Sequence, residues 1–123
     1  AQIISLPCPG LVEFVERGEL ESEALDDFLS ALFAPYKDES IDAVVLGCTH
    51  YPLIRESIQK SLGSGVAVFD GGAGTARETL RKLKEYQILS DSTERGTVVF
   101  ENSTGDERMI ELSRYLLERN LKH

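Results

Sequence analysis

The chain is poor in several features, and each shortage excludes a class of protein. Its 13 Lys and Arg are outnumbered by 21 Asp and Glu, which gives a net charge of −8 over 123 residues. Nucleic acids and anionic membranes bind clustered Lys and Arg, so neither is expected as a partner. No apolar run approaches the roughly 18 residues that span a bilayer. Because no basic segment precedes the first apolar residues, no signal peptide is expected either.

Cysteine and histidine are also scarce. The two cysteines, Cys8 and Cys48, fit a reducing compartment, and their low density favours free thiols over a disulfide. The two histidines are His50 and His123. Ligands drawn from the cysteines, His50 and nearby acids have no recognisable spacing, so no metal site is expected.

What the chain does contain is a succession of apolar runs and helical patterns. Its 41% of hydrophobic residues suffice for one core. Helical spacing of apolar residues predicts helices over 11–15, 25–33, 54–62, 76–83 and 109–120. Short apolar runs predict strands at 2–6, 41–46, 66–69 and 97–100. The run 41–46 is typical of a strand buried on both faces, so the sequence predicts an α/β fold with a parallel sheet.

Local signals predict where several of these helices begin and end. Ser22 is expected to cap the helix over 25–33, and Gly63 to end the helix that precedes it. After Asp70, the glycine-rich residues 71–74 are expected to form a tight turn, with Gly74 or Thr75 capping the next helix. The glycine spacing fits neither common phosphate-binding template, so a phosphate site is not expected.

The most informative segment, residues 47–53, reads Gly-Cys-Thr-His-Tyr-Pro-Leu and follows a predicted strand. Cys48 is therefore expected in the turn that leads into a helix, where the partial positive charge of a helix N-terminus favours a thiolate. Such a thiolate abstracts a proton or attacks a carbon. The alternatives from the residues alone are an inert buried thiol and, for His50, a surface or capping histidine.

This heptad resembles the second cysteine motif of glutamate racemase, a cofactor-independent enzyme of the aspartate/glutamate racemase superfamily. Three further stretches match in order. Residues 6–18 are similar to the family's Cys-Pro segment, 70–76 to its Asp-(Ser/Gly)-Gly-x-x-Thr-Ala turn, and 103–106 to its Thr-Thr-Gly-Asp. Many members carry serine where this chain has Gly71. The resemblance covers nearly the whole chain, but only the second half of the family.

The resemblance implies that L- and D-glutamate are interconverted by two cysteines, which remove and return the proton on Cα. Cys48 would be one of these catalytic residues, a role that suits a thiol whose reference pKa lies near 8.5. His50 would be catalytic as well, by assisting Cys48. Thr49 would bind the substrate, and Glu16 would support the site. Cys8 matches a cysteine that is not catalytic in the family. The resemblance further implies no cofactor, a cytoplasmic location and a place in peptidoglycan synthesis for cell-wall biogenesis.

The family's first half carries an Asp-Ser-Gly-x-Gly-Gly motif and a Cys-Asn-Thr motif with the first catalytic cysteine, and this chain has neither. We therefore expect a fragment of a two-domain racemase with a three-layer, parallel-sheet α/β architecture. Residues 1–70 would belong to the second domain, and residues 71–123 would return to complete the first. The fragment alone is expected to be inactive. Its partners would be glutamate, the missing N-terminal half and, through uncovered apolar surface, a second copy as a homodimer or other self-association.

Two other functions stay open. The nearer one is an aspartate-type or other amino-acid racemase of the same superfamily, although aspartate-type members tend to carry Glu where this chain has His50. The other is a non-catalytic α/β domain with a structural or redox-sensing thiol. That reading predicts an unreactive or merely oxidisable Cys48 and no affinity for glutamate.

Overall fold

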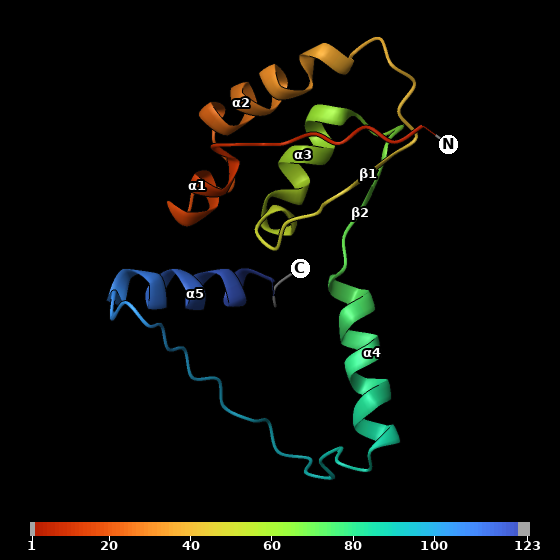
Figure 1. Cartoon of the computed structure of the whole chain (residues 1–123). Helices are drawn as coiled ribbons and strands as arrows, with labels where there is room; N and C mark the ends of the chain where they lie inside the picture. Colours follow the sequence, from red (N-terminus) through yellow and green to blue (C-terminus); the bar gives the residue numbers. More distant parts are fainter. Residues whose placement is uncertain (1, 121–123) are drawn as a thin grey trace. The chain divides into compact units, whose positions relative to one another are not determined.

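A computed structural model describes residues 2–120 of the chain. Contacts within the chain divide it into two units, Ala1–Asp70 and Gly71–His123. The first unit contains α1 (Leu11–Glu16), α2 (Glu23–Phe33), the 3₁₀ turn η1 (Ala34–Tyr36), β1 (Ala43–Val45), the 3₁₀ turn η2 (Tyr51–Ile54), α3 (Arg55–Leu62) and β2 (Ala67–Phe69). The second contains α4 (Gly72–Glu85) and α5 (Glu107–Asn120) (Figure 1).

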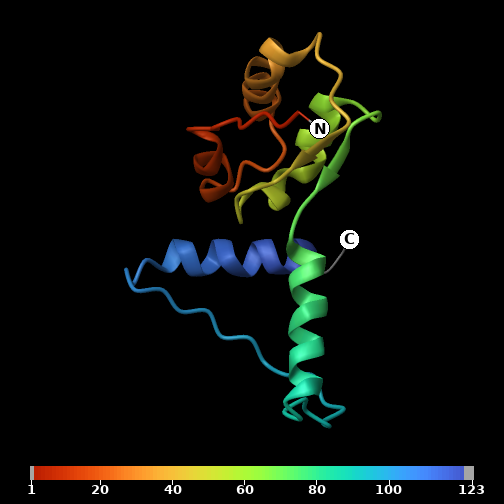
Figure 2. The same ribbon diagram turned by 45° about the vertical axis from the view of Figure 1, so that its right-hand side comes forward.

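The two strands pair in parallel, with Val44 opposite Val68 and Val45 opposite Phe69. Helix α3 lies between them in sequence, so the chain contains a β–α–β succession, as the sequence predicts. Figures 1 and 2 both show α1, α2 and α3 on one side of the strand pair. Side chains alternate across a strand, and Val68 on the helix side is buried.

The other face of the strand pair is uncovered, which corrects the prediction of a strand buried on both faces. Val45 is 74% exposed and Phe69 56% exposed. The strand is also shorter than the predicted run 41–46, because pairing extends only over Ala43–Val45. Since helices cover a single face, the described residues of this unit form two layers, and the expected third layer is not among them.

The core of the first unit lies between the helices and the inner face of the strands. Ser22 caps α2 as predicted, because its Oγ accepts a hydrogen bond from the Leu25 amide at 3.1 Å. Leu25 and Leu29 lie on the buried face of α2, which packs against α3. The hydroxyl of the buried Ser57 in α3 donates a hydrogen bond to the Leu20 carbonyl at 3.2 Å. Its burial therefore leaves no hydrogen-bond donor unsatisfied.

Two of the predicted strands, residues 2–6 and 97–100, are not strands in the structure. Ile3 and Ile4 in the first segment and Val98 and Val99 in the second are exposed. An apolar run forms a strand only when a neighbouring strand completes its backbone hydrogen bonds. Neither segment has such a neighbour within residues 2–120.

The start of α4 also differs from the prediction. The helix begins at Gly72, with Gly71 as its N-cap and no side-chain cap, so neither Gly74 nor Thr75 caps it. Thr75 already lies inside the first turn, where its amide donates to the Gly71 carbonyl at 2.9 Å. The turn predicted for residues 71–74 is therefore confined to the step from Asp70 to Gly71.

The second unit has no buried side chain among residues 71–119. Its helix α5 begins at Glu107, two residues before the predicted range 109–120, and the Asp106 carboxylate just before it accepts from the Arg108 amide at 3.0 Å. No helix within residues 2–120 has both the length and the apolar character needed to cross a membrane.

Candidate active site

The candidate site forms in the turn that follows β1. The amide of Leu46 donates to Phe69 at 2.8 Å as the strand pair ends, and η2 then begins at Tyr51. Cys48 therefore lies beyond the carboxyl end of β1, where ligands bind in parallel sheets. One part of the prediction is wrong: helix α3 starts only at Arg55, so the thiol is not at its N-terminus. The positive end of α3 is therefore not placed to stabilise a Cys48 thiolate.

The group that lies beside the Cys48 thiol is the imidazole of His50 and not the N-terminus of a helix. His50 Nδ1 lies 3.8 Å from Cys48 Sγ and 3.4 Å from Thr49 Oγ1. The other ring nitrogen, Nε2, lies 3.8 Å from Oε1 of Glu16, the last residue of α1. The structure thus brings together all four residues that the sequence singled out, although Glu16 is distant from the others along the chain.

This order of groups suits transfer of a proton. A carboxylate beside Nε2 favours the tautomer that carries hydrogen on Nε2, which leaves the Nδ1 lone pair facing the thiol. The imidazole can then accept the Cys48 proton and return it. The His50 and Glu16 side chains are 36% and 49% exposed, so water screens their attraction and its effect is mainly to orient the ring.

Sequence reasoning missed a second contact near the same turn. Cys8, a free and partly buried thiol like Cys48, donates to the Leu6 carbonyl at 3.3 Å. Burial raises the pKa of Cys8, the Tyr51 hydrogen bond partly offsets this, and neighbouring Cys48 raises it further. Tyr51, to which the sequence analysis assigns no role, also has a raised pKa, first through burial and then through the charges of both cysteines.

A further contact, which the sequence also does not predict, fixes the start of α3, just beyond the heptad 47–53. Arg55 pairs through Nη1 with the Asp70 carboxylate at 2.7 Å, and its other terminal nitrogen donates to the Val68 carbonyl. The first residue of α3 is thereby tied to the end of β2. A guanidinium that bonds a carboxylate and a backbone carbonyl at once is held more firmly than one in a single surface ion pair.

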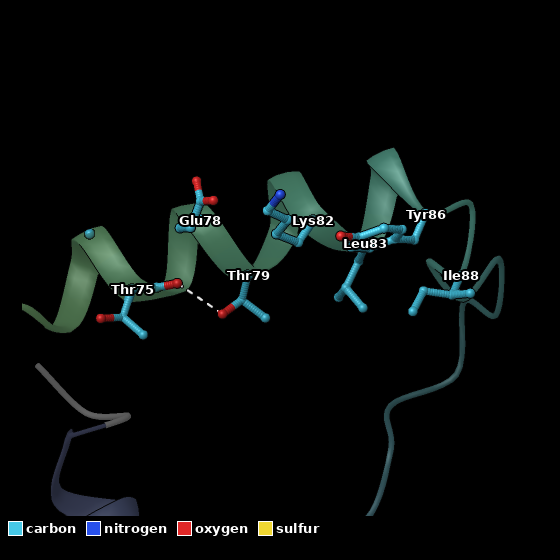
Figure 3. Close-up of a pocket in the computed structure, with 8 residues that line it drawn as sticks. Thr75, Glu78, Thr79, Lys82, Leu83, Tyr86 and Ile88 are labelled. Carbon is cyan, nitrogen blue, oxygen red and sulfur yellow. Dashed lines mark hydrogen bonds between the residues drawn. The ribbon is translucent and has the colours of Figure 1, made fainter.

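Two open hollows lie away from Cys48 and His50. One, of about 560 Å³, runs along α4, where Figure 3 shows Thr75, Thr79 and Leu83 on the same side of the helix. The other, of about 530 Å³, is lined by Arg55, Glu56, Gln59, Lys60, Gly63 and Ser64. Neither includes Cys48 or His50. A hollow along one exposed helix does not enclose a small ligand, so the chemistry of the turn locates the candidate site.

Comparison with known proteins gives consistent similarities. The family model for Asp/Glu/hydantoin racemase matches residues 5–79. A glutamate racemase of Clostridium botulinum is 46% identical over 94% of this chain and 45% of its own length. One from Clostridium perfringens is 45% identical over 95% of this chain and, again, 45% of its own length. The chain thus spans a little under half the length of the curated relatives it matches.

Two solved structures resemble the chain. A glutamate racemase from Francisella tularensis, crystallised in complex with D-glutamate, has a TM-score of 0.76 and 25% identity, and the match covers 91% of this chain and 42% of that one. A glutamate racemase isoform from Bacillus anthracis has a TM-score of 0.58 and 34% identity over 68% of this chain and 32% of its own. The mixed α/β arrangement with its small parallel sheet therefore matches part of a glutamate racemase structure.

Proposed function

The chain belongs to the Asp/Glu/hydantoin racemase family, and from this premise we propose that it is the C-terminal part of a glutamate racemase. The reaction is the interconversion of L- and D-glutamate. The observation that carries the proposal is the arrangement of Cys48, His50 and Glu16 in one turn and the helix beside it. The relatives named above support the substrate, since they are glutamate racemases and one was crystallised with D-glutamate.

Inversion at Cα requires a base on one face of the carbon and an acid on the other. Cys48 serves one face: as a thiolate it takes the Cα proton, and as a thiol it returns one. His50 accepts the thiol proton through Nδ1 and restores it, while Glu16 orients the ring and stabilises the imidazolium. The exposed Thr49 hydroxyl binds polar groups of the substrate. The second cysteine comes from the half of the enzyme outside this chain, and no cofactor takes part.

The domain assignment follows from the same proposal. Residues 1–70 form part of the second α/β domain, and residues 71–123 complete the first. The uncovered face of the β1–β2 pair and the lack of buried side chains in residues 71–119 support it, because both surfaces need further chain to cover them. With that chain present, the architecture becomes three-layered. The complete enzyme works in the cytoplasm and supplies D-glutamate for peptidoglycan.

The proposal predicts that Cys48→Ala in the complete enzyme lowers kcat/KM for glutamate by roughly 10²–10⁴-fold, the usual contribution of an acid/base group. Racemisation is followed by circular dichroism of the amino acid in both directions. The isolated 123-residue chain is expected to show no turnover, because it serves one face only. Ser64→Ala, a small exposed polar residue between two glycines, is the matched control and is expected to keep full activity.

Each contrary result has a distinct meaning. Near-normal turnover by the Cys48→Ala enzyme contradicts the acid/base role, and turnover by the isolated chain contradicts the need for a second half. Racemisation of aspartate but not of glutamate keeps the reaction and changes the substrate. If the complete enzyme racemises neither and binds no glutamate, the chain is a non-catalytic domain with a structural or redox thiol.

A further inference from the structure

Residues 46–55, which we call the Cys48 segment, are attached to the end of β2 at both of their ends. The first amide of the segment donates to the Phe69 carbonyl at 2.8 Å. The last residue, Arg55, donates through Nη1 to the Asp70 carboxylate at 2.7 Å and through Nη2 to the Val68 carbonyl. Consecutive residues at the end of β2 therefore hold the segment where it begins and where it ends.

The two attachments reach β2 from opposite sides. Backbone groups of successive residues in a strand point to opposite edges. Because the Phe69 carbonyl faces β1, the Val68 carbonyl faces the other edge. Within residues 2–120 no strand pairs with that edge, and the Arg55 guanidinium supplies the donor there. The end of β2 is thus held between the first and the last residue of the Cys48 segment.

The part of the segment that joins Arg55 to His50 is stiff. It consists of η2, in which the Leu53 amide donates to the His50 carbonyl at 3.0 Å and the Arg55 amide donates to the Pro52 carbonyl. The Pro52 ring restricts the backbone further, and the Ile54 side chain is buried. A displacement of Arg55 is therefore passed along η2 to His50.

The chemistry of arginine suits this attachment. A guanidinium is planar and donates from two nitrogens in fixed directions, whereas a lysine ammonium is a single point charge on a flexible stem. The Arg55 and Asp70 side chains are 42% and 21% exposed, so the pair is partly shielded from water. With the Val68 carbonyl as a second acceptor, the contact fixes the direction of the Arg55 side chain as well as its distance from the carboxylate.

We propose that Arg55 and Asp70 are positioning residues, which close the Cys48 segment against β2 and so keep His50 beside Cys48 and Glu16. The His50 ring must remain within reach of groups on two elements, because it lies 3.8 Å from Cys48 Sγ and 3.8 Å from Glu16 Oε1. A displacement of about 1 Å in a reacting group costs up to roughly 10²-fold in rate. The effect on racemisation rests on the function proposed above, whereas the closure is a property of this chain.

The first experiment uses the 123-residue chain and needs no activity. Hydrogen exchange of residues 46–54 is measured at about pH 7 in the natural chain, Arg55→Lys, Asp70→Asn and Arg81→Lys. Exchange is expected to rise several-fold in the first two variants, because the segment opens more often when the fork or the carboxylate charge is lost. Arg81→Lys is the matched control, since Arg81 also pairs with carboxylates, those of Glu78 and Glu85 in α4. It is expected to leave the segment unchanged.

Peptides from α2 distinguish positioning from general stability. If Arg55 and Asp70 close the segment, exchange over residues 25–33 stays as in the natural chain while exchange over 46–54 rises. An equal rise in both regions means that the substitutions loosen the whole unit, and this result overturns the positioning role. Unchanged exchange over 46–54 overturns the closure itself.

The second experiment uses the complete enzyme. Arg55→Ala is expected to lower kcat by roughly 3- to 30-fold with little change in KM, because the loss concerns the reacting groups and not binding. Arg55→Lys, which keeps the charge, should lose less. The double variant Arg55→Ala with Asp70→Asn should be no slower than the slower single variant, since both substitutions break one contact. Arg81→Lys is again the control and should keep the natural kcat.

The contrary results are distinct. Fully additive losses in the double variant, a natural kcat in Arg55→Ala, or a loss that appears in KM alone would each overturn the positioning role. Circular dichroism checks that every variant keeps its helices at the assay temperature. If the natural enzyme does not racemise at all, the proposed function fails, whereas the exchange data still decide on the closure.

Discussion

Cys8 and Cys48 are the same residue type in two different surroundings. Cys8 donates to the Leu6 carbonyl, and burial raises its pKa. Cys48 faces an imidazole that can accept its proton. The thiolate is the reactive form of cysteine, so these surroundings support the proposal that Cys48 takes part in the chemistry and Cys8 does not.

The contrast predicts different alkylation of the two thiols in the 123-residue chain. At pH 7, Cys48 is expected to react with iodoacetamide faster than Cys8. The rate at Cys8 should keep rising with pH beyond the ordinary pKa of a cysteine before it levels off, because a raised pKa keeps part of the thiol protonated to higher pH. Peptide-resolved mass spectrometry between about pH 6 and pH 11 measures both rates. Equal rates throughout would contradict the assignment, and the urea-unfolded chain is the control in which they should converge.

The proximity of neighbouring residues is the part of the candidate site that the sequence predicts. Cys48, Thr49 and His50 are consecutive, and the structure keeps their polar atoms within hydrogen-bonding reach or close to it. The ion pair of Arg55 with Asp70 was not predicted, because no local rule relates residues so far apart in sequence.

Among the elements, α2 illustrates how a helix is specified by local signals. Ser22 satisfies an amide at its N-terminus, and an apolar stripe with Leu25 and Leu29 provides the buried face. Capping side chains and an i, i+3, i+4 pattern act within a few residues, so both were predicted correctly. The strands at 2–6 and 97–100 were predicted wrongly, since a strand depends on a partner that local sequence does not supply.

The cap can be tested by one substitution. Ser22→Ala is expected to lower the free energy of unfolding by about 1 kcal/mol, because the Leu25 amide loses its acceptor. Ser30→Ala, on the exposed face of the same helix, is the matched control. It should leave stability unchanged or raise it by a few tenths, roughly the propensity difference between the two residues. Urea unfolding followed by circular dichroism measures both, and equal effects would contradict the cap.

For the whole molecule, the main feature is apolar surface that the chain does not cover. Val45 and Phe69 on the outer face of the strand pair are exposed, and so are Ile88, Val98 and Val99 in the second unit. Surface of this kind marks an interface or an aggregation site. In the proposed enzyme the missing half covers it.

The 123-residue chain is therefore expected to self-associate, with a mass above 13.6 kDa in light scattering coupled to size exclusion. Val45→Lys should reduce association, because a lysine on an open strand opposes pairing with another chain. Thr97→Lys, which makes the same kind of charge change at an exposed position outside any strand, is the control and should reduce it less. A stable, monodisperse monomer would contradict the expectation.

The sequence by itself determined the family, the α/β class, the helices with the cap at Ser22, and the order of residues around Cys48. These features depend on contacts between residues a few positions apart, or on a motif read directly from the chain. The tertiary structure alone decided that the strand pair is covered on one face, that α4 begins at Gly72, and that α1 brings Glu16 to His50. Each of these depends on which distant segments pack together, and burial and hydrogen-bond partners are settled only once the whole unit has folded.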